Sequence, residues 1–192
     1  MTLVKMVGYM TLDELISTSY EIAKSKGWWG KPRSFAALTL LMQSEISEAL
    51  EDYRAGKGLS EVWYAADGKV CGIPSELADT IIRIADFCGH FNLPLYAIQK
   101  SRLERVSDDF EIGLAEANAC ISAAYRDLSK IPKIADLWQA GSFGTAVSWS
   151  LTQAVQHIFY MCEANDINIW KAIEEKTAFN RTRPERHGGK AI

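Results

Sequence analysis

The spacing of apolar residues constrains this chain more than any other feature, because several long runs follow the turns of a helix. In the first run, Thr11 and Glu14 form a capping box, and apolar residues then recur every three or four positions toward Gly27. Ser34 is placed to cap a second run over residues 35–54. No segment alternates apolar and polar residues convincingly enough to indicate a strand. The pattern predicts an all-α fold.

Four more helical stretches are expected beyond the second one. Residues 57–75 are rich in glycine and turn formers, and we interpret them as a mobile loop in which Trp63 and Tyr64 could form a lid. Pro74 then introduces the third helix. The predicted stretches are residues 76–91, 96–129 with a break near Gly113, 144–165 and 169–179.

The composition is that of an ordinary globular domain. With 192 residues, of which 48% are hydrophobic, we expect one compact domain over residues 1–192. A formal charge of -3 and a charged fraction of 23% do not indicate a nucleic-acid or membrane partner. The four cysteines are scattered without a CxxC motif, so we expect reduced thiols and no zinc site. The first residues lack a long apolar stretch, and we expect a cytoplasmic protein without a signal peptide.

Two pairs of acidic residues are the main candidates for chemistry. Glu45 and Glu48 are three positions apart in one predicted helix, and Glu76 and Asp79 repeat that spacing in the next. Each pair borders the apolar residues of its helix, where crowded carboxylates need protons or cations to offset their repulsion. A single ExxE is more often an exposed helix face, but two pairs in matched settings favour a metal site. Oxygen ligands of this kind prefer Mg²⁺ or Mn²⁺.

The segments around these acids resemble the signature blocks of MazG-like all-α nucleoside triphosphate pyrophosphohydrolases. The segments are SEISEALEDYR, GIPSELADTIIRI and KTAFNRTRPERHGGK, and 27 residues separate Glu48 from Glu76. The resemblance covers residues 27–92 and 170–190. It is most similar to the short forms of phages and bacteria, but this chain has an extra helical stretch over residues 107–150.

The resemblance implies an activity and a set of roles. A metal-activated water would attack the α-phosphorus of a nucleoside triphosphate, giving a nucleoside monophosphate and pyrophosphate. The cofactor would be Mg²⁺, with Mn²⁺ able to substitute, and a purine deoxynucleotide is the favoured substrate. One of the four acids, or Glu51 or Asp52, would orient or deprotonate the water. Family members commonly form homo-oligomers. The residues implied as both metal ligands and catalytic groups are Glu45, Glu48, Glu76 and Asp79.

A second set of residues would bind the nucleotide. The C-terminal tail is basic within an acidic chain, and guanidinium and ammonium groups suit phosphate. Trp28 and Trp29 could stack on a base, although tryptophans are more often part of a core. Arg83 follows Asp79 by four positions and could reach a phosphate or neutralise the acids. The full set of candidates is Trp28, Trp29, Lys31, Arg83, Lys176, Asn180, Arg183, His187 and Lys190.

The two halves of the chain share spacings that suggest a decayed internal duplication. At an offset of 74 residues, Cys88 aligns with Cys162 and Leu93 with Ile167. Both halves follow the same apolar period, so a chance match stays open. The resulting division is a catalytic half over residues 1–105, an acid-poor second half over 106–165 and a basic phosphate-binding tail over 166–192.

Three other functions compete with this hypothesis. A dUTPase-like member of the same superfamily would differ in base choice and share the phosphate chemistry. A non-catalytic helical interaction module would keep the acids as residual charge, but the presence of all four acids together with the basic tail argues against it. A redox di-metal carboxylate bundle would add an ExxH motif, and no histidine of this chain lies three residues after a glutamate.

Overall fold

The computed structural model describes residues 10–97, 107–131 and 142–189, and this part of the chain is predominantly helical, which confirms the all-α prediction. A short antiparallel hairpin of β1 (Trp63–Tyr64) and β2 (Val70–Cys71) joins the second and third helices. The helices are α1 (Leu12–Ser25), α2 (Phe35–Arg54), α3 (Ile73–Phe91), α4 (Phe110–Leu128), α5 (Ser142–Ala164), α6 (Ile169–Thr182) and the one-turn α7 (Arg186–Gly189).

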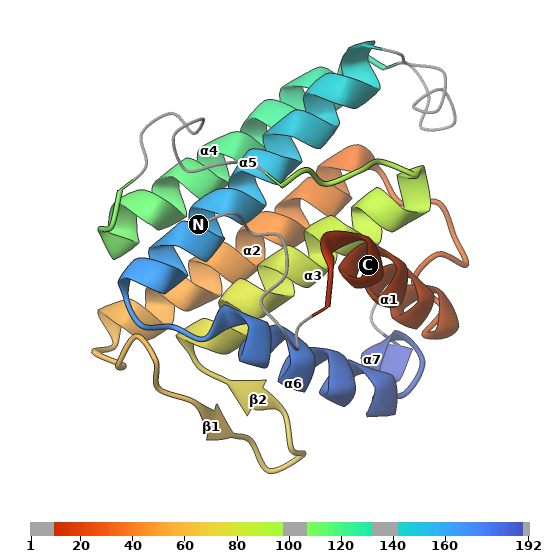
Figure 1. The fold of residues 1–192 in the computed structure, drawn as a ribbon. Helices are drawn as coiled ribbons and strands as arrows, with labels where there is room; N and C mark the ends of the chain where they lie inside the picture. Colours follow the sequence, from red (N-terminus) through yellow and green to blue (C-terminus); the bar gives the residue numbers. More distant parts are fainter. Residues whose placement is uncertain (1–9, 98–106, 132–141, 190–192) are drawn as a thin grey trace.

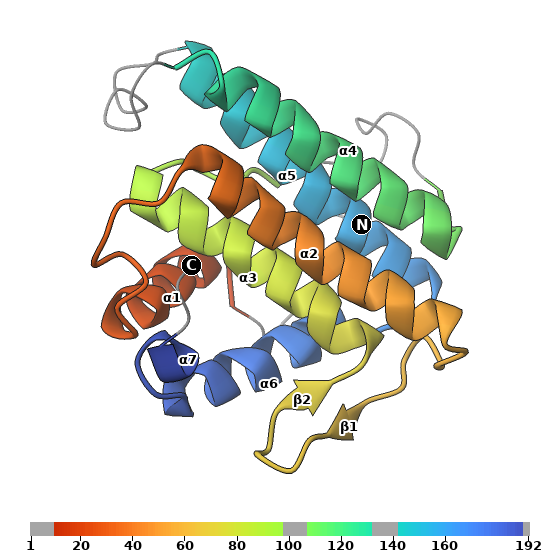
Figure 2. The same cartoon turned by 180° about the vertical axis from the view of Figure 1, so that it is seen from behind.

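Helix α3 lies at the centre of the molecule (Figure 1). On one side, α2 and α3 form a pair that packs against the pair α4 and α5, with α2 and α4 making most of the contact. On the other side, α1 and α6 pack directly on α3, as the view from behind also shows (Figure 2). Because both groups contact α3, its apolar residues Leu77, Ile81 and Ile84 are completely buried.

The first two helices begin where their capping residues predicted. The Thr11 hydroxyl accepts a hydrogen bond from the Glu14 backbone at 3.2 Å, and the Glu14 carboxylate accepts one from the Thr11 backbone at 2.7 Å. The Ser34 hydroxyl accepts from the backbone N–H of Ala37 at 3.1 Å. The observed bounds of α2, Phe35–Arg54, are those predicted, because its cap and its final turn are both encoded locally.

The third helix begins earlier than predicted, and the preceding loop contains a strand pair. Helix α3 starts at Ile73, because Pro74 fits the first turn of a helix, where its missing N–H has no partner to lose. In the hairpin, Trp63 pairs with Cys71 and Tyr64 with Val70. The expectation of no strand was therefore wrong for these residues. Strands of two residues are too short for an alternating pattern to be visible in the sequence.

Residues 93–97 and 107–109 are not helical, so the prediction of a helix over residues 96–129 was wrong at 96–97 and 107–109. Helix α3 ends at Phe91, with its C-cap residue Asn92 in the left-handed conformation, and α4 begins at Phe110, capped by the Asp109 side chain. Gly113 lies inside α4 and does not break it. Residues 98–106 lie outside the described part of the chain.

A stripe of buried polar residues on α5 binds the non-helical residues that directly follow α3. The hydroxyl of Ser148 donates to the Pro94 carbonyl. Thr152 accepts from the Tyr96 N–H at 3.2 Å, and Gln156 donates to the Tyr96 carbonyl at 3.4 Å. These side chains supply partners for the Pro94 carbonyl and for both backbone groups of Tyr96, which a helix would otherwise have supplied, whereas the buried Oε1 of Gln156 has no partner.

Helices α3 and α5 end in the same way. In both, a residue with a positive φ (49° and 56°) follows the helix within two positions, and the next N–H donates to the carbonyl five residues before it at 2.9 Å. The two helix ends are 74 residues apart, the same offset that the sequence comparison found. The internal duplication itself stays a prediction. The equivalent residues are Cys88 with Cys162, Asn92 with Asp166 and Leu93 with Ile167.

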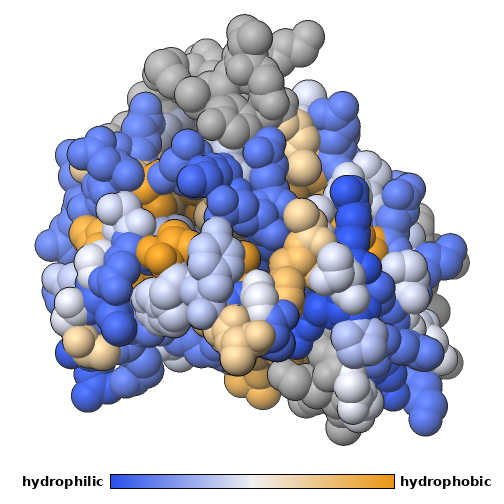
Figure 3. Space-filling model, turned by 90° about the horizontal axis from the view of Figure 1, so that it is seen from below, coloured by the Kyte–Doolittle hydropathy of each residue, from blue (hydrophilic) through white to orange (hydrophobic). Residues whose placement is uncertain are grey.

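Among the described helices, none combines the length and the apolar character needed to cross a bilayer. The face that carries the hairpin and α6 is covered mainly by hydrophilic side chains, with hydrophobic residues in small groups between them (Figure 3).

A glycine lets α1 approach α3 closely. A Cβ atom at Gly89 would lie 2.5 Å from the Tyr20 Cβ and 3.1 Å from the Ile16 carbonyl oxygen. Neither neighbour can move away cheaply, because one is attached directly to the backbone of α1 and the other is part of it. The contact between α1 and α3 therefore depends on this residue.

We expect Gly89→Ala to destabilise the protein by about 1–3 kcal/mol, the usual cost of overpacking a core. A loss of stability would be informative, because helix propensity alone favours alanine over glycine by about 1 kcal/mol. Urea unfolding followed by circular dichroism would measure the change, with Glu21→Ala on the exposed side of α1 as the control. Unchanged or increased stability of Gly89→Ala would contradict the close approach.

Candidate functional site

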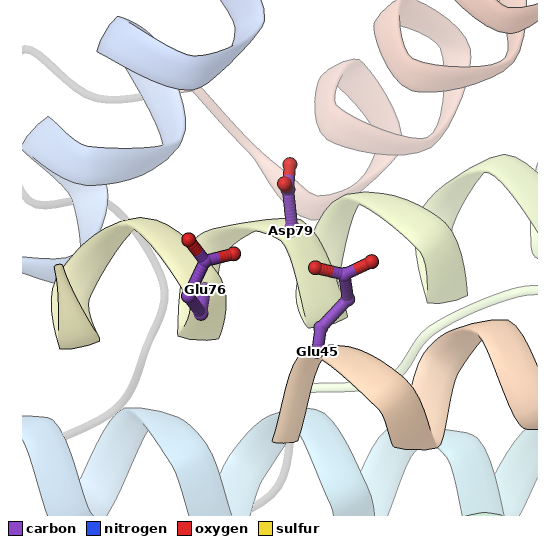
Figure 4. A group of neighbouring side chains, drawn as sticks. All are labelled: Glu45, Glu76 and Asp79. Atoms are coloured by element: carbon purple, nitrogen blue, oxygen red, sulfur yellow. The ribbon is translucent and has the colours of Figure 1, made fainter. Parts of the chain in front are cut away.

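Three of the four predicted acids meet between α2 and α3. Glu45 comes from α2, and Glu76 and Asp79 come from α3, with their carboxylates turned toward one shared space (Figure 4). One oxygen of each lies within 4.8 Å of the others. Glu45 and Glu76 are buried, and Asp79 is partly exposed. This set of oxygen ligands, with no nitrogen or sulfur among the described residues of the cluster, suits Mg²⁺ or Mn²⁺.

The fourth acid, Glu48, lies outside this cluster. It is exposed on α2, one turn from Glu45. Burial raises the pKa of Glu45, the nearby Arg83 opposes that rise, and the charges of Asp79 and then Glu48 add to it. Of the other acids proposed to handle the water, Glu51 is exposed and paired with Arg54 at 2.5 Å.

Lys176 is buried among the acids. Its side chain is 0% exposed, and its Nζ lies 2.9 Å from the Asp79 Oδ2. The ammonium also donates to the Ser75 hydroxyl at 2.7 Å and to the Val70 carbonyl at 3.2 Å. All three of its N–H groups are therefore used. The prediction that Lys176 contacts phosphate is corrected: its ammonium holds α6, β2 and α3 together.

Two more cations approach the cluster from its edges. Arg83 donates from Nε and Nη2 to the same Glu45 oxygen, at 2.7 Å and 2.6 Å. Lys69, on the hairpin, has its Nζ 3.8 Å from a Glu76 oxygen and is 33% exposed. The acids are thus balanced by cations from α3, α6 and the hairpin, of which Lys69 is the most loosely held.

One buried oxygen in the cluster lacks a partner. Glu76 is only 4% exposed, and its Oε2 is inaccessible to solvent and accepts no hydrogen bond. Burial raises the pKa of Glu76 from 4.5 to about 7, against the opposing charge of Lys176 and with the support of Asp79. An unsatisfied buried acceptor calls for a proton or a cation. The cluster therefore fits a divalent ion in chemistry and in geometry.

A pocket opens beside the acids, between α1, α3 and α6. Its walls include the carboxylates of Asp79 and Asp86, so it begins at the acid cluster and continues along α3. Its other charged, polar and aromatic wall residues come from all three sides of the pocket. Those that bear on binding are Lys26, Trp28, Arg33, Arg83, Asn180 and Arg183.

The structure divides the predicted nucleotide-binding residues into three groups. Trp28, Arg83, Asn180 and Arg183 line the pocket. Lys31 is exposed outside the pocket wall, Trp29 is not a wall residue but is bonded to Asp86 of the wall, and Lys176 belongs to the acid cluster. Lys190 and the side chain of His187 lie outside the described part of the structure.

Trp29 is held by its neighbours and is not placed to stack on a base. Its Nε1 donates to the Asp86 Oδ1 at 2.6 Å. The His90 ring is stacked on it with centroids 3.6 Å apart, and the Arg33 guanidinium lies 4.3 Å from its centre. Groups this close must lie on opposite faces of the ring. Both faces are occupied, so the predicted base contact is left to Trp28.

Asp86 and Lys26 are pocket residues that the sequence analysis missed. Burial raises the pKa of Asp86 to about 7, and the Trp29 hydrogen bond and Arg33 oppose that rise. A signal for Asp86 was present, because it follows Asp79 by seven positions and Arg83 by three, which places all three on one helix face. Lys26 had no such signal, since its place in the wall depends on how α1 packs.

No protein-family model, no curated protein and no solved structure matches this chain.

Replacing the buried lysine tests its structural role. We expect Lys176→Met to lower the free energy of unfolding by about 3 kcal/mol or more, because Asp79 would keep a largely uncompensated charge. Lys171→Met on the same helix is the matched control: its side chain is 66% exposed and its Nζ lies 3.7 Å from Glu175. The control should lose less than about 1 kcal/mol. Equal losses in the two variants, measured by urea unfolding, would refute the buried role.

The raised pKa of Glu76 predicts how stability depends on pH without metal. The folded state holds this proton up to about pH 7, whereas the unfolded state releases it near 4.5. The stabilisation that the bound proton of Glu76 gives the folded state is therefore fully present below pH 4.5 and is lost as the pH rises through about 7. We expect Glu76→Gln to lose less stability than wild type between these pH values in EDTA. Glu174→Gln, exposed on α6, should behave as wild type; a parallel profile for Glu76→Gln would contradict the assignment.

Proposed function

We propose that this protein is a Mg²⁺-dependent nucleoside triphosphate diphosphatase that hydrolyses a ribo- or deoxynucleoside triphosphate to the monophosphate and pyrophosphate. The observation that carries the proposal is the cluster of Glu45, Glu76 and Asp79, which opens onto a pocket lined by cations. Carboxylates that bind a metal, next to cations that bind phosphate, are what the hydrolysis of a polyphosphate requires.

Glu45, Glu76 and Asp79 would hold the ion, and Glu76 has a buried oxygen that accepts no hydrogen bond. Mg²⁺ bound there would offset charge on the phosphates and lower the pKa of a bound water. Glu48 is one helical turn from Glu45 and exposed, so a change of rotamer could add it as a ligand or let it orient the water. The metal would also compensate the charge that Arg83 and Lys69 now balance.

The residues of the pocket have separate tasks in this proposal. Arg183 and Asn180 on the α6 side face Arg83 on α3, so phosphate oxygens between them would meet donors from both walls. Lys176 keeps the Asp79 carboxylate in place without using a solvent-exposed donor. Water attacks the α-phosphorus, and the bond to the bridging oxygen breaks to release pyrophosphate.

Two further arguments support this proposal over its competitors. The resemblance of the acidic blocks and the basic tail to MazG-like enzymes points to the same three clustered acids and to Asn180 and Arg183 of the pocket, and it extends to a homo-oligomeric assembly. A non-catalytic helical module would have no reason to keep Glu76 buried with an unsatisfied oxygen, which costs about 1–3 kcal/mol. A dUTPase-like activity would use the same acids and would differ from the proposed activity only in the choice of base.

Product analysis tests the activity. The purified chain is incubated with Mg²⁺ and each common nucleoside triphosphate, and the products are separated by anion-exchange chromatography. We expect monophosphate and pyrophosphate, whereas diphosphate and phosphate would place the attack at another phosphorus. Activity on dUTP alone would favour the dUTPase-like alternative. If no nucleotide is cleaved with Mg²⁺ or Mn²⁺, the interaction module becomes the better explanation.

Substitution of the acids tests the site. We expect Glu76→Gln and Asp79→Asn each to lower kcat/KM by about 100-fold or more, since a metal ion supplies several kcal/mol of charge stabilisation. Glu174→Gln, exposed on α6, is the control and should keep wild-type activity. Circular dichroism would confirm that each variant is folded. Full activity in both acid variants would rule out this metal site.

A further inference from the structure

Four charged residues follow one face of α3. Glu76, Asp79, Arg83 and Asp86 are spaced by three, four and three positions, which keeps them within one stripe of the helix. The first two belong to the acid cluster, and the last three line the pocket. Asp79 and Asp86 are seven residues apart, so the pocket runs along about 10 Å of the helix axis. This length is comparable with a nucleotide measured from its α-phosphorus to its base.

The charges at the two ends of this stripe orient a nucleotide. The end at Asp79 adjoins the acid cluster, where a metal ion, Arg83 and Arg183 would attract the phosphates. At the other end, the Asp86 carboxylate would repel a phosphate. A nucleotide in the pocket would therefore place its base at Asp86, beside Trp28.

The Asp86 carboxylate is positioned by its neighbours. Its Oδ1 accepts from Trp29 at 2.6 Å, and its Oδ2 lies 3.9 Å from the Arg33 Nη2. The side chain keeps 15% of its surface exposed and forms part of the pocket wall. Arg33 is only 9% exposed, and its Nε and Nη2 have no hydrogen-bond partner. The Asp86 end of the pocket, where the nucleobase would lie, thus combines a fixed carboxylate with a guanidinium that has two buried N–H groups without hydrogen-bond partners.

A carboxylate next to a guanidinium is complementary to one base edge in particular. A carboxylate accepts best from two adjacent N–H groups, and a guanidinium donates to a carbonyl oxygen beside them. Among the common bases, guanine alone presents two adjacent N–H positions, N1 and the 2-amino group, followed by the O6 acceptor. Adenine and cytosine offer one amino group next to an acceptor, and uracil and thymine offer one N–H between two carbonyls.

From this arrangement we infer that Asp86 is the specificity-determining residue of the pocket, that it binds the N1–H and 2-amino groups of guanine, and that Arg33 faces O6. The inference rests on the proposed function for the identity of the ligand as a nucleotide. It adds the base, which neither the acid cluster nor the phosphate-binding residues determine.

Binding of nucleoside monophosphates tests the inference separately from catalysis. Calorimetry at pH 8, above the raised pKa of Asp86 of about 7, would compare dGMP with dIMP, which lacks only the 2-amino group. We expect dGMP to bind at least about tenfold more tightly, the value of one hydrogen bond to a charged acceptor. The comparison uses the wild-type protein, so it does not depend on a variant that folds. Equal affinities would overturn the inference.

Asp86→Asn provides a second test, because its amide has one acceptor and one donor. Xanthine carries a carbonyl where guanine has its 2-amino group, so we expect the variant to bind dXMP more tightly than dGMP, reversing the wild-type order. Asp13→Asn, exposed in the first turn of α1, is the matched control and should keep the wild-type order. An unchanged preference for dGMP in Asp86→Asn would show that another group reads the base.

These outcomes separate the two proposals. Hydrolysis of all nucleoside triphosphates at similar rates, with equal affinities for dGMP and dIMP, would remove the role of Asp86 and leave the diphosphatase intact. Selective dGMP binding by a protein that cleaves no nucleotide would keep the guanine pocket and remove the enzyme.

Discussion

The buried ammonium of Lys176 is the contact on which the candidate site depends. It joins elements that are distant in the chain: α6, which carries it, β2 through the Val70 carbonyl, and α3 through Asp79. A buried ammonium must find a partner for each N–H, so these contacts determine where α6 lies along α3. The wall that contains Asn180 and Arg183 is positioned relative to the acids as a consequence. The sequence pattern assigns Lys176 to phosphate binding, but its contacts are better explained by its part in building the pocket.

Helix α3 combines two roles that oppose each other energetically. Its apolar face is the centre of the core, where Leu77, Ile81 and Ile84 are fully buried. Its polar stripe, which includes Glu76 and Asp86, lies against α1, α2 and α6 and is largely removed from water. Burial raises the pKa values of both carboxyl groups to about 7, so part of the stability of the core offsets the cost of keeping them there.

Neighbouring cations reduce this cost without removing it. Arg83 makes two short contacts with one Glu45 oxygen, and Lys69 lies at 3.8 Å from Glu76. These pairs leave the Oε2 of Glu76 unsatisfied. The site therefore holds its carboxylates close together before any ligand arrives, which is the preorganisation that binding a hard cation needs. The same principle applies at the far end of the pocket, where Trp29 orients Asp86.

Local signals in the sequence determined the helices and the spacing of the acids. Caps such as Ser34 and the apolar period act over a few residues, so both ends of α2 could be predicted, together with the pairing of acids on α2 and α3. The tertiary structure decided which charges meet: it excluded Glu48 from the cluster and brought Lys176 to Ser75, 101 positions away. Those partners depend on which side chains are buried together when helices pack, and no pattern within one helix encodes that.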